Sequence, residues 1–146
     1  MNFAELEMYV LRAIDKLYAR DSGLLLADAS EWALAHRLAV YLEQIIPGWN
    51  VDCEYNRQGT GSDPKVDSKE GRRRPDIMLH HRGWLPPEHN LLVIELKKKE
   101  TDADCKKVCE FTTPPSGKRR FQYQYGLTLS FIPALRIRWF ENGQKR

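Results

Sequence analysis

Asn90-Leu91-Leu92-Val93-Ile94-Glu95-Leu96-Lys97 is the stretch that decides the fold. Every position from Leu91 to Leu96 except Glu95 is apolar. A strand that is apolar on both faces is buried on both sides, so we predict a central strand over 90–97. Residues two apart on a strand share a face, so Glu95 and Lys97 point the same way while Leu96 points into the core. A charged Glu95 in the most buried strand costs free energy unless it is paired or bound to a metal.

Two amphipathic helices are predicted ahead of this strand. The first, over 3–19, has apolar residues at three- and four-residue steps and opens with the capping-box pair Asn2 and Glu5. The second, over 30–46, has a continuous apolar stripe and stops at Pro47. We expect the second helix to pack against the sheet.

Two strands are predicted between the helices and the central strand, over 49–55 and 75–81. The segment 56–73 between them lacks apolar periodicity, and we predict a long mobile loop there. After the central strand a helix is predicted over 101–111, with Thr101 as its N-cap. Strict alternation then predicts a strand over 121–131.

Glycine 126 is expected to form a bulge in that strand. A final strand is predicted over 134–140, where apolar residues alternate with arginines. The resulting order α-α-β-β-β-α-β-β predicts a single α/β or α+β domain over 1–146, with a mixed sheet flanked by helices.

The composition is that of an ordinary globular domain. The chain has 146 residues, a net charge of +3 and three cysteines, a count that argues for a reducing compartment over a disulfide framework. We expect a cytoplasmic protein without a membrane segment, because no apolar run approaches the ~20 residues that a span requires. Cys105 and Cys109 with His80 or His81 leave a structural zinc site open, although buried apolar packing is favoured for both cysteines.

A candidate metal site follows from two carboxylates on neighbouring strands. Asp76 follows Pro75 near the start of one strand, where it would meet Glu95 across the pair. Such oxygen ligands suit Mg²⁺ or Mn²⁺, and these ions promote phosphodiester hydrolysis. Lys97 would steady negative charge on the phosphate or help to deprotonate the water. The alternative is a charged strand end, with Asp76 capping a turn.

The spacing of Pro75-Asp76 and Glu95-Leu96-Lys97 resembles the PD-(D/E)XK nuclease superfamily. That resemblance implies a restriction-endonuclease-like three-layer core over about 30–131, with the first helix and the last strand as additions. It also implies that Asp76, Glu95 and Lys97 are catalytic, and that an acidic residue of the first core helix completes the metal site. Glu31 is the matching position, although capping-box spacing from Asp28 offers a structural role instead.

Basic and aromatic residues near the site are candidates for nucleic-acid contacts. They are Arg72, Arg73, Arg74, Lys98, Lys99, Tyr123, Gln124 and Tyr125. For the tyrosines, core packing is the favoured alternative. We therefore expect a Mg²⁺- or Mn²⁺-dependent nuclease, with DNA favoured over RNA and with specificity supplied by loops, a homodimer or a partner protein. The alternative is a catalytically silent nucleic-acid-binding or protein-interaction domain that keeps the fold.

Overall fold

The computed structural model of the chain describes residues 1–27, 29–55, 66–67, 71–72, 74–117 and 120–146. Three α-helices form in these residues, together with one short 3-10 helix. They are α1 (Phe3–Leu26), α2 (Glu31–Ile45), α3 (Asp102–Thr112) and η1 (Pro87–His89). The strands are β1 (Asn50–Cys53), β2 (Val66–Asp67), β3 (Gly71–Arg72), β4 (Ile77–His80), β5 (Asn90–Lys97), β6 (Tyr125–Ser130), β7 (Arg136–Glu141) and β8 (Gln144–Lys145).

Strand β5 lies inside a six-stranded mixed sheet with the order β1-β4-β5-β6-β7-β8. It pairs antiparallel with β4 and parallel with β6. A parallel neighbour requires a crossover connection, which α3 provides. Asn90 to Leu96 are all buried, so the central strand predicted over 90–97 is confirmed with its boundaries.

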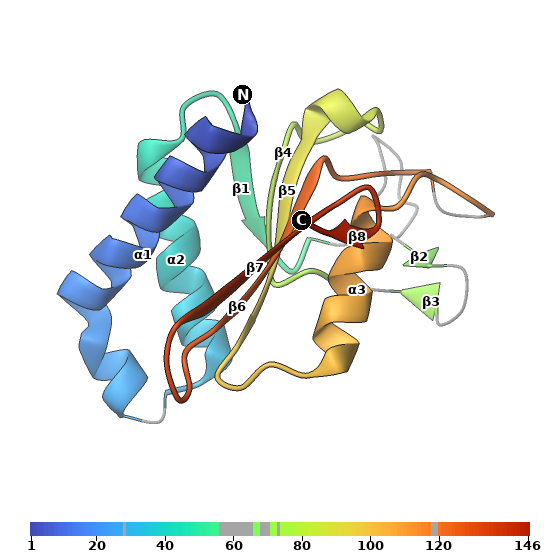
Figure 1. Cartoon of the computed structure of the whole chain (residues 1–146). Coiled ribbons are helices and arrows are strands. Elements are labelled where there is room, and N and C mark those ends of the chain that lie inside the picture. The colour runs from blue at the N-terminus through green and yellow to red at the C-terminus, as the bar shows by residue number, and fades with distance from the viewer. Residues whose placement is uncertain (28, 56–65, 68–70, 73, 118–119) are drawn as a thin grey trace.

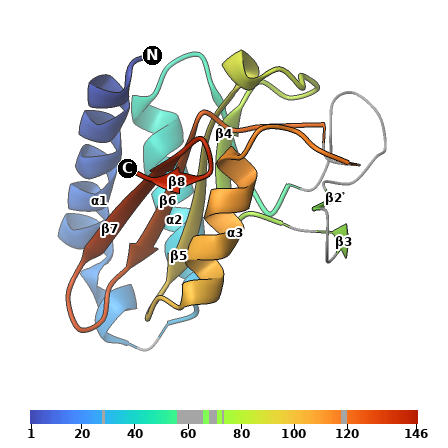
Figure 2. The same ribbon diagram turned by 45° about the vertical axis from the view of Figure 1, so that its right-hand side comes forward.

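Helices cover both faces of the sheet and produce three layers (Figures 1 and 2). Helices α1 and α2 pack on the face that carries Leu92 and Leu96, within the larger hydrophobic cluster. Helix α3 covers the other face, where Val93 belongs to a second cluster. The predicted α+β architecture is thereby confirmed. Because side chains alternate along a strand, Glu95 shares the face of Val93 and lies beneath α3.

Helix α1 is longer than predicted, because it continues past 19 to Leu26 with a break in helical geometry at Asp21 (φ −126°, ψ 24°). The Asp21 carboxylate accepts hydrogen bonds from Tyr41 Oη and from Arg37 Nε at 3.2 Å, both on α2. These contacts tie the irregular turn to α2. The local sequence favours a helix end at this position, but with these tertiary contacts the helix continues beyond it.

Strand β6 is shorter than the predicted 121–131, because the ladder begins only at Tyr125. Phe121 and Tyr123 are nevertheless buried in the cluster beneath α3. The Tyr123 amide donates to Phe111 O of α3 at 2.9 Å, outside the sheet. The alternating pattern thus predicted which side chains are buried, but not which residues pair with a neighbouring strand.

The predicted bulge at Gly126 is wrong, since its register with both β5 and β7 is continuous. A Cβ at this position would lie 2.4 Å from Val108 Cγ1 of α3 and 3.0 Å from Thr112 Cγ2. The glycine is required by the close approach of α3 to the sheet, which also brings the side chains of α3 near Glu95.

The predicted last strand over 134–140 is observed as β7, and β8 follows it without having been predicted. Asn142 and Gly143 connect the two strands with φ of 51° and 74°. Positive φ at both positions is typical of the type I′ turn of a two-residue hairpin.

Strands β1 and β4 confirm the predictions over 49–55 and 75–81 with shorter ends. The loop predicted over 56–73 falls largely outside the described residues, apart from the paired β2 and β3. No described helix is long and apolar enough to cross a membrane.

Candidate functional site

Asp76 and Glu95 lie at the same end of the β4–β5 pair. Ile77 is opposite Ile94 in the antiparallel register, so Asp76, one residue before β4, comes beside Glu95. Asp76 Oδ2 accepts a hydrogen bond from the Leu96 amide at 2.8 Å. The Asp76 carboxylate is therefore fixed to the backbone between Glu95 and Lys97.

The Glu95 side chain is almost completely buried, with 1% exposed. Lys107 Nζ, from α3, lies 2.5 Å from Glu95 Oε1 and donates to Arg74 O at 2.8 Å. Apart from this contact with Lys107, the two oxygens of Glu95 accept no hydrogen bond from a described residue. Buried carboxylates normally accept hydrogen bonds, and this one calls for an explanation. We refer to Asp76, Glu95, Lys97 and Lys107 as the Glu95 cluster.

Two pKa shifts follow from this arrangement. Burial, reinforced by the neighbouring charge of Asp76, raises the pKa of Glu95 to about 7, against the attraction of Lys107 and Lys97. Partial burial lowers the pKa of Lys97, but the charges of Asp76, Glu95 and Glu31 outweigh burial and leave that pKa above its ordinary value. Lys97 is therefore a cation at neutral pH.

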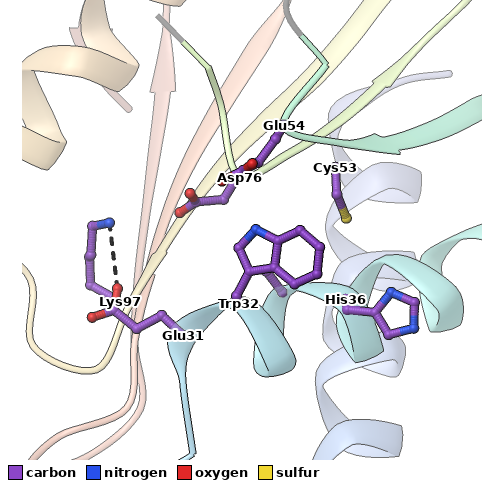
Figure 3. A pocket seen from close by; sticks show the side chains of 8 residues that line it. Glu31, Trp32, His36, Cys53, Glu54, Asp76 and Lys97 are labelled. Atoms are coloured by element: carbon purple, nitrogen blue, oxygen red, sulfur yellow. Dashed lines mark ion pairs between the residues drawn. The ribbon is translucent and has the colours of Figure 1, made fainter.

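A cavity of about 220 Å³ opens beside this cluster. Figure 3 shows Asp76 and Lys97 facing it from the sheet, and Glu31 facing it from the start of α2. Glu31 Oε2 lies 3.4 Å from Lys97 Nζ. The cavity thus brings together three of the four predicted catalytic residues, while Glu95 lies buried behind them.

Glu31 is the first residue of α2, and Ser30 caps the helix by accepting from the Ala33 amide at 3.2 Å. The alternative role for Glu31 needs Asp28 as the cap. The cap lies at Ser30 instead, so that capping-box alternative is wrong, and Asp28 itself lies outside the described residues. The Glu31 side chain, 41% exposed, remains available to the cavity.

Sequence reasoning missed three residues of the site: Glu54, Trp32 and Lys107. Glu54 lines the cavity, has a φ of 49°, and donates its amide to Asp76 O at 3.2 Å. Its place beside Asp76 depends on pairing across the 56–73 segment, which no local pattern reveals. Trp32 follows Glu31 and could have been noticed as a tryptophan on the polar side of a helical stripe.

The predicted nucleic-acid contacts have different outcomes. Tyr123 has no exposed surface, so its predicted stacking is wrong, and the alternative of core packing holds. Tyr125 is half-buried with its ring centroid 5.4 Å from that of Phe3, and Gln124 Nε2 donates to Pro87 O at 3.0 Å. For Gln124 and Tyr125, which keep part of their surface exposed, contacts to nucleic acid stay a prediction.

Among the predicted basic residues, Arg74 precedes β4, and Lys98 and Lys99 follow β5. Lys99 and Arg74 are exposed, and Lys98 is half-buried. Arg73 lies outside the described residues, as does the side chain of Arg72. Phosphate contacts by these residues stay a prediction.

The donor chemistry of the site fits a hard divalent cation. Asp76 and Glu95 offer carboxylate oxygens, and those of Glu95 are buried with no hydrogen bond from a described residue other than Lys107. Within the described part of the chain, no group of three or more histidine, cysteine or acidic side chains stands ready to hold a metal ion. Cys105 and Cys109 are half-buried and pack against the cluster beneath α3.

Comparison with known proteins gave no match: neither a family profile, nor a curated protein, nor a solved structure corresponds to this chain.

Proposed function

We propose that this protein is a Mg²⁺- or Mn²⁺-dependent nuclease with a restriction-endonuclease-like core, and that DNA is favoured over RNA. The element order supports this proposal. Along the chain, the helix α2 is followed by the strands β1, β4 and β5, each antiparallel to the one before it in the sheet. The helix α3 and the strand β6, which is parallel to β5, come next. The superfamily resemblance implies the same order, with Asp76 at the second strand and Glu95 and Lys97 on the third.

The observation that carries the proposal is the state of Glu95. A carboxylate with 1% exposure in a central strand is costly to ionise, because its oxygens accept no hydrogen bond from a described residue other than Lys107. A leucine at this position would fit the apolar strand. A functional ligand explains why a carboxylate is present instead, and perturbed carboxyl groups of this kind are common in active sites.

Asp76 and Glu95 would hold the ion, with Glu31 and Glu54 at the same cavity. A bound divalent ion supplies Lewis-acid polarisation of the phosphate and a more acidic bound water. Lys97 remains positively charged beside these carboxylates. It would stabilise the negative charge that develops on the phosphate, rather than accept a proton.

A second function is favoured by one contact. The Lys107 ammonium already neutralises Glu95, as it would in a domain that keeps the fold and binds nucleic acid without cutting it. Binding of an ion at Glu95 requires this long side chain to move aside. Lys107 is 23% exposed, which gives its ammonium a route to solvent.

The experiment is cleavage of circular, linear and single-stranded DNA and of structured RNA, with Mg²⁺, Mn²⁺ or EDTA. Glu95→Gln keeps the shape of the side chain and removes its charge. Glu88→Gln is the matched control, because Glu88 is exposed on η1. We expect metal-dependent cleavage by the wild type and by Glu88→Gln, and none by Glu95→Gln. Binding without cleavage under every condition would establish the silent domain instead.

A further inference from the structure

Trp32 differs from the other tryptophans of the chain in its surroundings. Trp49 stacks on His81 with ring centroids 4.2 Å apart, and Trp84 lies 4.6 Å from the ring of His89. Trp139 packs edge-on against Phe3 at 5.1 Å. Within the described part of the chain, Trp32 has no such ring contact, and 60% of it is exposed.

The position of Trp32 adds to its exposure. It stands in the first turn of α2, next to Glu31, and lines the same cavity as Asp76 and Lys97. In Figure 3 the indole lies between the carboxylates of Glu31 and Asp76 on one side and His36 and Cys53 on the other. An exposed aromatic face thus adjoins the charged residues of the candidate site.

The cavity is lined by both charged and less polar groups. Burial, with the negative charges of Asp52, Asp76 and Glu54, raises the pKa of the Cys53 thiol, so that it stays uncharged. Ala35, the indole and the imidazole of His36 line the cavity together with this thiol. At about 220 Å³ the cavity is smaller than the about 300–1,000 Å³ of sites for drug-sized ligands. It suits one flat group better than a segment of duplex.

We propose that Trp32 is a stacking platform for one unpaired base, and that the substrate is single-stranded DNA or duplex DNA with an unpaired nucleotide at the cut. This inference rests on the proposed nuclease function and narrows its substrate class. In the interior of an intact duplex both faces of every base are covered by neighbouring bases. Away from a duplex end, a ring on the protein can therefore stack on a base only when that base has left the helix.

The test compares Trp32→Ala and Trp32→Phe with Trp84→Ala, the matched control, since Trp84 is 57% exposed at the other end of β5. Binding of a labelled single strand, its perfect duplex and a duplex with one unpaired base is measured by fluorescence anisotropy with Ca²⁺. Trp32→Ala is expected to weaken binding of the two substrates with unpaired bases by about 5- to 150-fold, the range for loss of base–aromatic stacking. Its duplex binding stays within about twofold, and Trp32→Phe retains most of the affinity.

A set of single strands with one abasic position each locates the stacked base. For the wild type, one abasic position is expected to weaken binding as much as the Trp32→Ala substitution does. The same abasic strand should bind Trp32→Ala no more weakly than the complete strand does, because both changes remove the same contact. If Trp32→Ala binds every substrate like the wild type, or loses affinity for the duplex equally, the inference is overturned.

The outcomes separate this inference from the nuclease proposal. If Trp32 selects unpaired bases in the binding assay and the wild type never cleaves, the stacking role stands and the nuclease proposal falls. If the wild type cleaves in Mg²⁺ and Trp32→Ala cleaves and binds identically, the nuclease proposal stands and the stacking role falls.

Discussion

Two carboxylates lie on the strands at either side of β4, in contrasting surroundings. Asp52, on β1, accepts hydrogen bonds from Arg82 Nε at 2.7 Å and Nη2 at 2.6 Å, and lies 2.8 Å from His80 Nε2. We refer to Asp52, His80 and Arg82 as the Asp52 cluster. On the other side of β4, Glu95 contacts Lys107 and accepts no hydrogen bond from another described residue.

The two carboxyl groups shift their pKa values in opposite directions. Burial raises the pKa of Asp52, but the hydrogen bonds from Arg82 and His80 outweigh burial and leave it lowered. For Glu95 burial prevails and the pKa rises to about 7. The comparison teaches that a buried charge with full hydrogen bonding serves the fold, whereas one without it needs another reason to be present.

The largest expected difference between the two clusters is in cleavage. Glu95→Gln should lower kcat/KM by on the order of 10³-fold or more, because it removes an ionised ligand of the metal ion that the proposed reaction requires. Asp52→Asn should leave kcat/KM within about threefold, since no residue of the Asp52 cluster lines the cavity. Steady-state cleavage rates with Mg²⁺ decide this, and equal losses in both variants would remove the functional distinction between the clusters.

The second difference is in the pH dependence of stability. The folded-state pKa of Glu95 lies above its ordinary 4.5, so its contribution to stability is present below 4.5 and is lost as the pH rises through about 7. The loss corresponds to roughly 3 kcal/mol. In EDTA at pH 8, Glu95→Gln should therefore be more stable than the wild type by about this amount, with no difference at pH 4.5.

Asp52→Asn should show the opposite sign. Its lowered pKa contributes stability above its ordinary value of 3.8, and this stability is lost as the pH falls through the folded-state pKa. Guanidinium unfolding curves at pH 8 and pH 4.5 measure the effect at Glu95, and curves continued below pH 3.8 measure that at Asp52. Destabilisation by Glu95→Gln at pH 8 would mean that the Lys107 ion pair stabilises the fold and that the contrast is wrong.

A smaller effect is expected from Lys107→Met. The change removes the cation next to Glu95 and should destabilise the protein in EDTA at pH 8 by about 2–3 kcal/mol. Removing one partner of a buried ion pair usually costs about 3–5 kcal/mol of stability. The cost here is expected to be smaller, because Glu95 can take up a proton and become neutral. The double variant with Glu95→Gln should recover the stability of Glu95→Gln alone. Unfolding curves of the four proteins form the cycle, and an additive result would exclude coupling between the two side chains.

Local patterns were enough to predict the strand that positions the site. The apolar run ending in Glu95 and Lys97 predicted a buried central strand with its boundaries, and Thr101 predicted the start of α3. The Thr101 amide donates to Asp104 at 2.8 Å, as a capping box requires. These features depend on residues close in sequence, whose period and spacing can be read directly.

The rest of the site depends on contacts between distant segments. Lys107 reaches Glu95 only because α3 packs closely on the sheet at Gly126, and Glu54 adjoins Asp76 only through the pairing of β1 with β4. Asp21 interrupts the geometry of α1 without ending it, because its contacts to α2 override the local preference for a helix end. The spacing of residues along the sequence alone does not predict these contacts between distant segments.

The most direct test of the account is thermal unfolding of the wild type and Glu95→Gln at pH 8, in EDTA and in increasing Mn²⁺. A ligand that binds only the folded state stabilises it by about 2.7 kcal/mol at one hundred times its Kd. We predict that Mn²⁺ raises the Tm of the wild type in a saturable way and leaves that of Glu95→Gln unchanged. An equal rise in both proteins, or none in the wild type, would contradict the claim that Glu95 is buried to hold a metal ion.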